Sequence, residues 1–195
     1  MWKFILLLFL SVQLITNAGY AQSYGLRFSS HEVVQEKRTT LNLTSSGPLC
    51  FRKDAEISFD LNFLPYKETY FGYIVRIIGA NNKNIDLVYN QKERTFNFLI
   101  GESFSREFAL DSVALFGQWL HFSIRLDLAN SEAAIYVDNR FICKGAAKLG
   151  SPLCTRVFFG TNTYEGFQTV DIPPMNLKNI IVKEGGHIRY NWPLS

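Results

Sequence analysis

The chain has 195 residues with 47% hydrophobic and 15% aromatic side chains, and its formal net charge is +3. The basic residues are scattered along the chain, which excludes an electrostatic surface built for nucleic acid. The length fits one domain with a sizeable core, and the 17 Phe and 9 Tyr favour strands over helices.

The first 21 residues have the pattern of a secretory signal peptide. Lys3 gives a basic start, residues 4–10 begin an apolar run, and Gly19 and Ala21 supply the small residues of a cleavage site. The run is short for a bilayer span, although a retained membrane anchor is the alternative. We therefore expect export to the periplasm, the cell surface or the medium. The mature chain is expected to be one domain over residues 22–195 without a membrane attachment once the signal peptide is removed.

The rest of the sequence alternates between apolar and polar residues with a period of two. This alternation predicts half-buried strands at residues 55–63, 95–100, 120–127 and 134–137. Further strands are expected near residues 24–28, 40–43, 70–78, 85–89, 107–110, 156–160, 177–182 and 188–192. Turn residues separate them, as at Asp138-Asn139, because Asn and Asp tolerate left-handed backbone angles.

The strand pattern predicts the fold class. No segment shows a sustained helical period, so the chain is expected to be all-β. So many antiparallel strands in a chain of this length fit two packed sheets, a jelly-roll sandwich, better than a small closed barrel. The residues expected in the shared core are Phe59, Leu61, Phe122, Ile124, Ile135 and Val137.

The three cysteines leave at least one thiol unpaired. Export permits a disulfide, and the short separation between Cys143 and Cys154 predicts that these two could pair across neighbouring strands, with Cys50 left free. The alternative is three buried thiols that act as small hydrophobic side chains.

Two segments carry a resemblance to a known superfamily. Residues 117–124 (GQWLHFSI) followed by residues 134–139 (AIYVDN) resemble the laminin-G/concanavalin A-like lectin–glucanase superfamily, in which a Gly-x-Trp opens a strand and a hairpin returns a strand ending in Tyr-Val-Asp-Gly. Asn139 stands at the usual glycine, and residues 175–180 resemble the closing strand. The resemblance implies a concanavalin A-like jelly roll that binds a ligand, with carbohydrate as the leading candidate.

Three shorter stretches resemble a more specific module. Residues 23–28, 38–43 and 171–175 are similar to the amino-terminal module of exported bacterial proteins in which a Kelch-type propeller follows. That resemblance implies a following or partner domain. Residues 188–194 alternate and then end apolar at Trp192 and Leu194, which predicts a terminal strand and an apolar patch that meets this domain.

Enzymes of the superfamily use paired carboxylates in a Glu-x-Asp-x-x-Glu strand motif. The nearest match, Glu56 and Asp60, shares one strand face, but four residues at ~3.3 Å each place the two about 13 Å apart. Retaining glycosidases need about 5–5.5 Å and inverting ones about 6.5–9.5 Å, and no third acid completes the motif. We expect a solvated strand face, no catalytic residue and no enzyme activity.

The sequence predicts no cofactor. His31, His121 and His187 lack the spacing of metal ligands. Many laminin-G relatives bind Ca²⁺ in rim loops, so the resemblance leaves calcium open. The available oxygen donors form no dense acidic loop; they are Asp86, Asp127, Asp138 and Asp171.

Aromatic rings in loops are the candidate ligand contacts, because such rings can stack on the apolar face of a sugar. A surface aromatic can equally cap the edge of the sandwich. Trp119 opens a core strand, and we expect it to be buried. The predicted ligand-binding residues are Tyr66, Tyr70, Tyr164 and Phe167, together with the amide of Asn162.

These observations favour a secreted, non-catalytic binding module for carbohydrate. The alternative is a structural or protein-interaction domain that packs on a neighbouring, propeller-type module. A glycan hydrolase is the third class, and the carboxylate spacing disfavours it.

Overall fold

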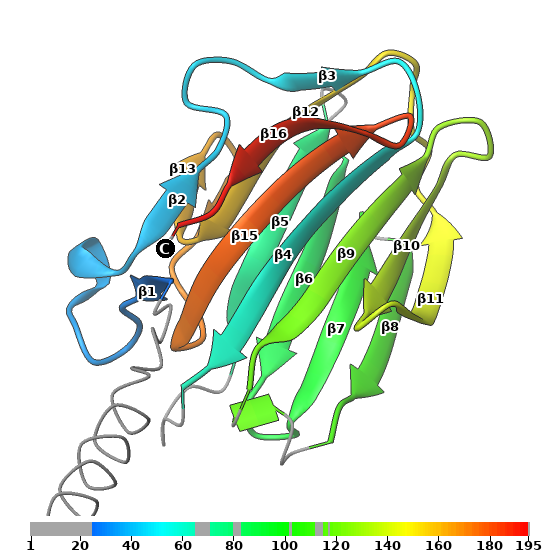
Figure 1. The fold of residues 1–195 in the computed structure, drawn as a ribbon. Helices are drawn as coiled ribbons and strands as arrows, with labels where there is room; N and C mark the ends of the chain where they lie inside the picture. The colour runs from blue at the N-terminus through cyan, green and yellow to red at the C-terminus, as the bar shows by residue number, and fades with distance from the viewer. Residues whose placement is uncertain are drawn as a thin grey trace, which may run out of the picture.

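The computed structural model describes residues 25–64, 71–79, 83–101, 103–111, 115–116 and 118–194. These residues form two antiparallel sheets that face each other, which confirms the predicted two-sheet jelly-roll sandwich (Figure 1). The leader predicted at residues 1–21 lies outside the described residues. Among the residues that are described, none belongs to a helix long and apolar enough to cross a membrane.

In one sheet, here called the front sheet, strand β15 (Met175–Glu184) lies between β1 (Leu26–Phe28) and β4 (Ala55–Phe63). β15 pairs along one side with β4 and along the other with both β1 and β16. In spatial order the front sheet consists of β1 (Leu26–Phe28) with β16 (His187–Trp192), β15 (Met175–Glu184), β4 (Ala55–Phe63), β9 (Leu120–Asp127), β10 (Glu132–Val137) and β11 (Arg140–Ala146).

The other sheet, the back sheet, is arranged in the same way around β12, which pairs on one side with both β2 and β3. Its spatial order is β2 (Thr40–Asn42) with β3 (Leu49–Phe51), β12 (Leu153–Gly160), β5 (Gly72–Gly79), β6 (Asn84–Asn90), β7 (Thr95–Ile100) and β8 (Phe104–Ala109). A short 3-10 helix, η1 (Gln35–Lys37), and a separate hairpin of β13 (Asn162–Tyr164) and β14 (Phe167–Thr169) complete the described elements.

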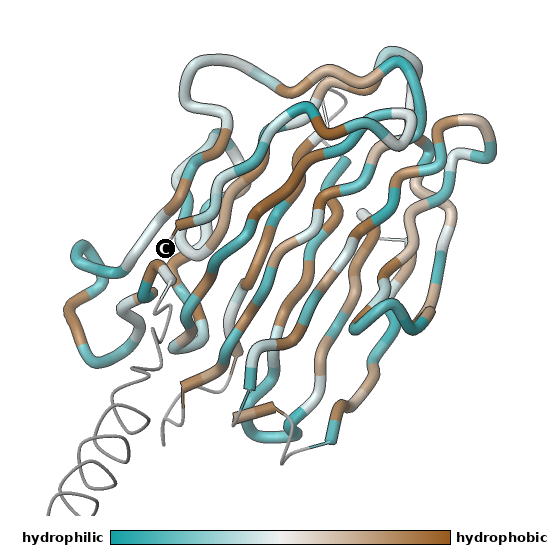
Figure 2. The backbone as a smooth tube through the Cα atoms, viewed as in Figure 1, coloured by the Kyte–Doolittle hydropathy of each residue, from teal (hydrophilic) through white to brown (hydrophobic). Residues whose placement is uncertain are grey.

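The core lies between the sheets and follows the period of two, which Figure 2 shows as alternating apolar and polar positions along the strands. All six residues predicted for the shared core are buried. Phe59 on β4 stacks on Phe122 of β9 at 5.7 Å between ring centroids, and it meets Phe159 of the back sheet edge-on at 5.0 Å. Aromatic contacts therefore join neighbouring strands and the two sheets at once.

The turn predicted at Asp138-Asn139 is confirmed. Both residues have left-handed φ angles, of 48° and 63°, and they connect β10 to β11. A tight hairpin with two left-handed residues matches the twist of the strands that it joins. Asp138 also accepts a hydrogen bond from the His121 backbone at 2.9 Å, which ties the turn to β9.

Neither alternative considered for the cysteines, a Cys143–Cys154 disulfide or three free thiols, is found. Cys154 forms a disulfide with Cys50, which lies directly opposite it in the β3–β12 register, whereas Cys143 is a buried free thiol. The chain crosses from the front sheet to the back sheet between residues 143 and 154, so a short separation in sequence does not make these two strands neighbours. Burial raises the pKa of the Cys143 thiol, which keeps it protonated in the core.

Candidate functional site

Three of the five predicted ligand-binding residues lie together on the β13–β14 hairpin. Asn162, Tyr164 and Phe167 belong to its two short strands, and the rings of Tyr164 and Phe167 lie over side chains of the back sheet. Tyr66 and Tyr70 lie outside the described residues.

The hairpin covers a buried ion pair. Arg76 on β5 donates two hydrogen bonds of 2.9 Å to the carboxylate of Asp86 on β6, and both side chains are almost fully buried. Asn84 adds a third bond, from Nδ2 to Asp86 Oδ2 at 2.6 Å. The guanidinium lies 4.1 Å from the ring centroid of Tyr73 and 5.8 Å from that of Phe167. Burial raises the pKa of Asp86, against the pull of the Arg76 cation.

Tyr164 packs in a similar way over β12, the strand next to β5 in the back sheet. Its ring lies 5.7 Å from the ring of Phe158 and 5.5 Å from the guanidinium of Arg156, both on β12. Tyr164 and Phe167 are both half-buried, so one part of each ring seals the sheet and the rest meets solvent. The two aromatic side chains thus act as a partial cover, as a cap on the sandwich would.

Asn162 has a structural position. It is only 4% exposed, and its Oδ1 accepts a hydrogen bond from the Tyr164 backbone at 3.2 Å, which shapes the start of the hairpin. Its Nδ2 is buried and has no partner among the described residues. The side chain therefore sets the position of Tyr164 and lies away from the surface where a ligand would approach.

Phe167 lines a hollow of about 460 Å³, here called the Phe167 hollow. Besides Phe167, its lining includes four polar residues and four small or apolar ones; they are Lys83, Asn84, Ser103 and Lys148, with Ile100, Gly101, Ala146 and Ala147. The volume lies within the 300–1,000 Å³ typical of small-ligand sites. Sequence reasoning found Phe167 as a loop aromatic but missed the polar residues, because they come from three other connections that only the fold brings together.

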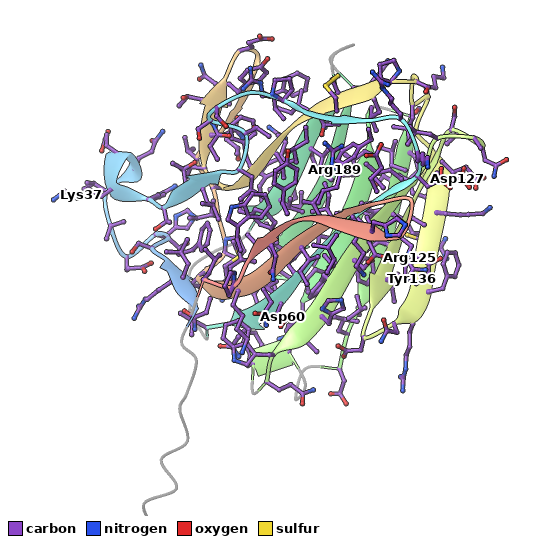
Figure 3. All side chains as sticks on the ribbon, turned by 45° about the horizontal axis from the view of Figure 1, so that its top comes forward. Lys37, Asp60, Arg125, Asp127, Tyr136 and Arg189 are labelled. Atoms are coloured by element: carbon purple, nitrogen blue, oxygen red, sulfur yellow. A yellow bond between two sulfur atoms is a disulfide. The ribbon has the colours of Figure 1, made fainter. Side chains whose placement is uncertain are left out.

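The outer face of the front sheet carries the other candidate chemistry, in a cross-strand charge network. Glu56 accepts hydrogen bonds from Arg125 and Lys183, each at 2.8 Å. The Arg125 guanidinium also lies 4.1 Å from the ring centroid of Tyr136, and Figure 3 shows these two residues side by side with Asp60 farther along the sheet. Burial acts to raise the pKa of Glu56, but the hydrogen bonds from Lys183 and Arg125 outweigh it, so the pKa is lowered.

Asp60 is held in the same way. Its Oδ1 lies 2.7 Å from His121 Nδ1, and its Oδ2 accepts a hydrogen bond from Asn179 at 2.6 Å. Burial acts to raise the pKa of Asp60, but these hydrogen bonds outweigh it and the pKa is lowered.

The expectation of a buried Trp119 is wrong: the ring is half-exposed, just before β9, with Lys178 Nζ 4.1 Å from its centroid.

The candidate calcium ligands are not brought together. Asp86 pairs with Arg76, Asp127 accepts two hydrogen bonds from Asn130, Asp138 accepts one from the His121 backbone, and Asp171 pairs with Arg38. No group of three or more His, Cys, Asp or Glu side chains is placed to hold a metal ion in the part of the chain that the structure describes.

No protein-family model and no curated protein sequence matches the chain. Solved structures do match it. A SAP-like pentraxin from Limulus polyphemus is 13% identical with a TM-score of 0.57, and the match covers 83% of this chain and 77% of the pentraxin. The fold is concanavalin A-like. A Trypanosoma rangeli sialidase matches at 11% identity and a TM-score of 0.55, over 86% of this chain and 26% of the sialidase.

The LG4-5 domains of the mouse laminin alpha1 chain match at 17% identity and a TM-score of 0.50, over 80% of this chain and 42% of that one. The concanavalin A-like fold therefore spans most of this chain, whereas the chain spans about a quarter of the sialidase and less than half of the laminin segment. At these identities the similarity establishes the fold, and the chemistry of the site has to be argued from the residues themselves.

Proposed function

We propose that the protein is an exported, non-catalytic carbohydrate-binding module and that it holds a sugar in the Phe167 hollow. The observation that carries this proposal is the half-exposed Phe167 ring in a hollow of about 460 Å³ that is also lined by four polar residues. A sugar ring has an apolar C–H face and a rim of hydroxyls, which this combination of an aromatic ring with amide, hydroxyl and ammonium groups complements.

The buried ion pair helps to orient this site. Because Asn84 Nδ2 donates to Asp86, the Asn84 side chain is fixed with its carbonyl Oδ1 as the remaining acceptor for a sugar hydroxyl. Arg76 holds Asp86 in place through two bonds, and its guanidinium lies 5.8 Å from the centroid of the Phe167 ring. The ring and the amide are thereby positioned before any ligand arrives, which lowers the entropic cost of binding.

Two features support export and the absence of catalysis. A disulfide such as Cys50–Cys154 persists in an oxidising compartment, as a secreted protein would meet. Among enzymes, a glycosidase acid needs a raised pKa, whereas Glu56 and Asp60 are ion-paired with lowered pKa values. The fold alone does not choose between binding and catalysis, since the structural neighbours include a pentraxin and a sialidase.

A glycan-array screen of the exported protein, with and without Ca²⁺, tests this proposal. We expect binding of at least one glycan class without Ca²⁺, and at least a tenfold loss of affinity in Phe167→Ala. The matched control is Phe141→Ala, which removes another exposed aromatic ring from β11 of the front sheet. Array-wide absence of binding, or equal affinity of Phe167→Ala and the parent, would contradict the proposal.

A second candidate function is docking to a partner domain such as the propeller that the narrower resemblance implies. The predicted terminal strand is present as β16, and its Ile188 side chain is 60% exposed. An exposed edge strand with large apolar side chains is a surface on which another chain can pair. Co-purification of the exported protein with a propeller domain, lost in Ile188→Ser, would support this function.

A further inference from the structure

A second concave surface lies at the open edge of the sandwich, where β16 of the front sheet faces the connection from β2 to β3. This edge groove has a volume of about 480 Å³, and its lining consists of residues 41–43 and 45–49 on one side and Tyr190, Trp192 and Leu194 on the other. It shares no lining residue with the Phe167 hollow.

One wall of the edge groove is an aromatic pair. Tyr190 and Trp192 alternate along β16 and therefore point to the same side, with ring centroids 5.4 Å apart and planes within 6° of parallel. Tyr190 is 39% exposed, and Trp192 is half-buried against the core. The two stacked rings give the groove a continuous apolar wall made of two aromatic side chains.

The opposite wall combines the leucine side chains of Leu41, Leu43 and Leu49 with a short polar stretch. Ser45, Ser46 and Gly47 supply hydroxyl and backbone groups, and Pro48 stiffens the chain that follows. A Cβ atom built on Gly47 would meet nothing within 4 Å, so the loop leaves open space at this point. The wall thus offers donors and acceptors close to a free volume.

The polar stretch of the opposite wall is anchored from beneath by Thr44. Its hydroxyl accepts a hydrogen bond from the Val157 backbone at 3.2 Å, and its carbonyl accepts one from Arg156 at 2.7 Å. Thr44 is fully buried, so these bonds fix the loop to β12.

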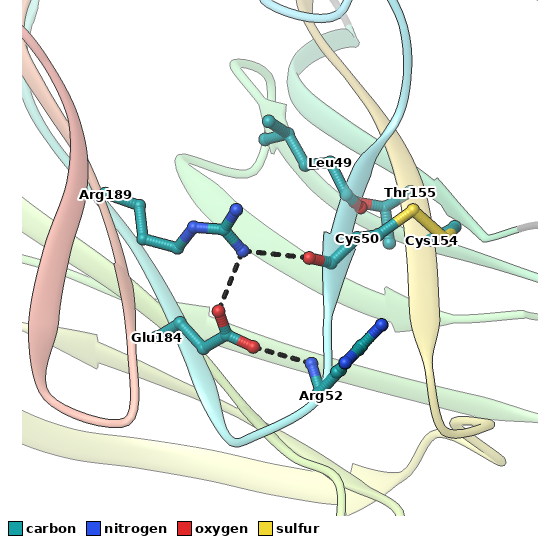
Figure 4. The surroundings of a disulfide bond; sticks show 7 residues. All are labelled: Leu49, Cys50, Arg52, Cys154, Thr155, Glu184 and Arg189. Carbon is teal, nitrogen blue, oxygen red and sulfur yellow. Dashed lines mark hydrogen bonds and ion pairs between the residues drawn. A yellow bond between two sulfur atoms is a disulfide. The ribbon is translucent and has the colours of Figure 1, made fainter.

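The two walls are also tied to each other at one end of the groove (Figure 4). The Cys50–Cys154 disulfide joins β3 to β12, and Arg189 on β16 donates hydrogen bonds to the Cys50 carbonyl at 3.0 Å and to Glu184 at 2.7 Å. Glu184 in turn accepts a hydrogen bond from the Arg52 backbone at 2.6 Å. The separation of the walls is therefore held by hydrogen bonds between them, from Arg189 to the Cys50 carbonyl and from the Arg52 backbone to Glu184, and the disulfide fixes β3 to β12 behind one wall.

The chemistry of the lining indicates what the edge groove takes. None of its lining residues is charged, and the nearby Arg189 is committed to Glu184 and the Cys50 carbonyl. An aromatic wall opposite leucine side chains and neutral hydroxyls suits a ligand with apolar C–H surfaces and a neutral polar rim. We propose that the edge groove is a second carbohydrate site, which binds a neutral sugar residue against Tyr190 and Trp192.

Tryptophan fluorescence tests this proposal directly, because Trp119 and Trp192 are the two tryptophans that follow the predicted leader. In a Trp119→Phe background, Trp192 becomes the reporter of the exported protein. The probes are cellohexaose, xylohexaose, mannohexaose and laminarihexaose, with an oligogalacturonate as the acidic comparison. We expect at least one neutral oligosaccharide to change the emission saturably, with at least tenfold weaker binding in Tyr190→Ala.

Two controls separate this site from its neighbours. Ile188→Ala changes an exposed side chain on the same strand outside the groove and should leave the titration unchanged. Phe167→Ala should also leave it unchanged, so failure of the Phe167 hollow and failure of the edge groove are distinguishable.

Three results would overturn the proposal. One is an unchanged Trp192 emission with all four neutral probes, and another is a response to the oligogalacturonate alone. The third is a dimer in sedimentation equilibrium that Tyr190→Ala converts to a monomer, because the groove would then hold a second copy of the chain.

Discussion

Arg76 and Asp86 lie directly opposite each other on β5 and β6 and are joined by two hydrogen bonds of 2.9 Å on the outer face of the back sheet. This is a buried charge pair outside the main core, sealed by Tyr73 and by Phe167 of the β13–β14 hairpin. Removing one partner leaves the other charge buried without compensation. We expect Arg76→Ala to lower the free energy of unfolding by about 3–5 kcal/mol in urea unfolding.

The matched double variant, Arg76→Met with Asp86→Leu, separates the cost of an orphaned charge from the value of the pair. Replacing both partners with apolar groups of similar volume is often neutral or stabilising, so this variant should be much more stable than Arg76→Ala. The double variant should also bind glycan more weakly, because Asn84 loses the acceptor that fixes its amide. An Arg76→Ala protein as stable as the parent would show that the pair is not buried.

The disulfide provides a second prediction. The bond joins residues separated by 104 positions, and closing so long a loop removes much conformational freedom from the unfolded chain. We expect Cys50→Ala with Cys154→Ala to lose about 2–5 kcal/mol of the free energy of unfolding. Thiol labelling in denaturant should find one reactive cysteine, Cys143, without reductant and three with it. Three reactive thiols without reductant would contradict the pairing.

The main strands were predictable because a strand with one buried face has a period of two in its sequence. The residues of β4 and β9 alternate in this way, and the structure buries the same members, such as Phe59 and Phe122. β3 and the β13–β14 hairpin were not predicted, because three residues show little alternation, although the equally short β1 and β2 were expected. β11 was missed because its single buried residue, Cys143, gives no alternation.

The candidate sites were only partly predictable, because they depend on contacts between distant segments. Phe167 could be chosen as an aromatic in a turn-rich stretch, but the amide that faces the same hollow, Asn84, comes from a different sheet connection. Cys50 pairs with Cys154 only because β3 and β12 are neighbours in the back sheet. The sandwich also buries outer-face residues such as Phe158 beneath the hairpin, and a period of two assigns those positions to solvent.

The His121–Asp60 pair predicts a pH dependence of stability. The hydrogen bond to Asp60 raises the pKa of His121 above its ordinary value of about 6.5, and the pKa of Asp60 is lowered. The contribution of His121 to the free energy of unfolding is fully present below pH ~6.5 and is lost as the pH rises through its raised pKa. The contribution of Asp60 to the free energy of unfolding is lost in acid, as the pH falls below about 3.8 and through its lowered pKa.

Urea unfolding from pH 6 to pH 8.5 should therefore show a loss of stability in the parent that His121→Gln lacks. Because the pair is partly exposed, we expect the difference to stay below about 1 kcal/mol. His31 and His187 are present in both proteins, so the difference isolates His121. An NMR titration that places the pKa of His121 at or below its ordinary value would refute the prediction.

Glu56 and Asp60 also carry the last prediction, which concerns catalysis. Hydrolysis of a glycosidic bond needs a carboxylic acid that stays protonated near neutral pH, which burial without a cation provides. The cations Arg125 and Lys183 instead hold Glu56 ionised, and His121 and Asn179 do the same for Asp60. We expect the parent to release no reducing sugar from a panel of β-glucans, while Glu56→Gln and Asp60→Asn keep full affinity at the Phe167 hollow, whose lining includes neither residue. Release of reducing ends by the parent, abolished in Glu56→Gln, would show instead that the front face is an active site.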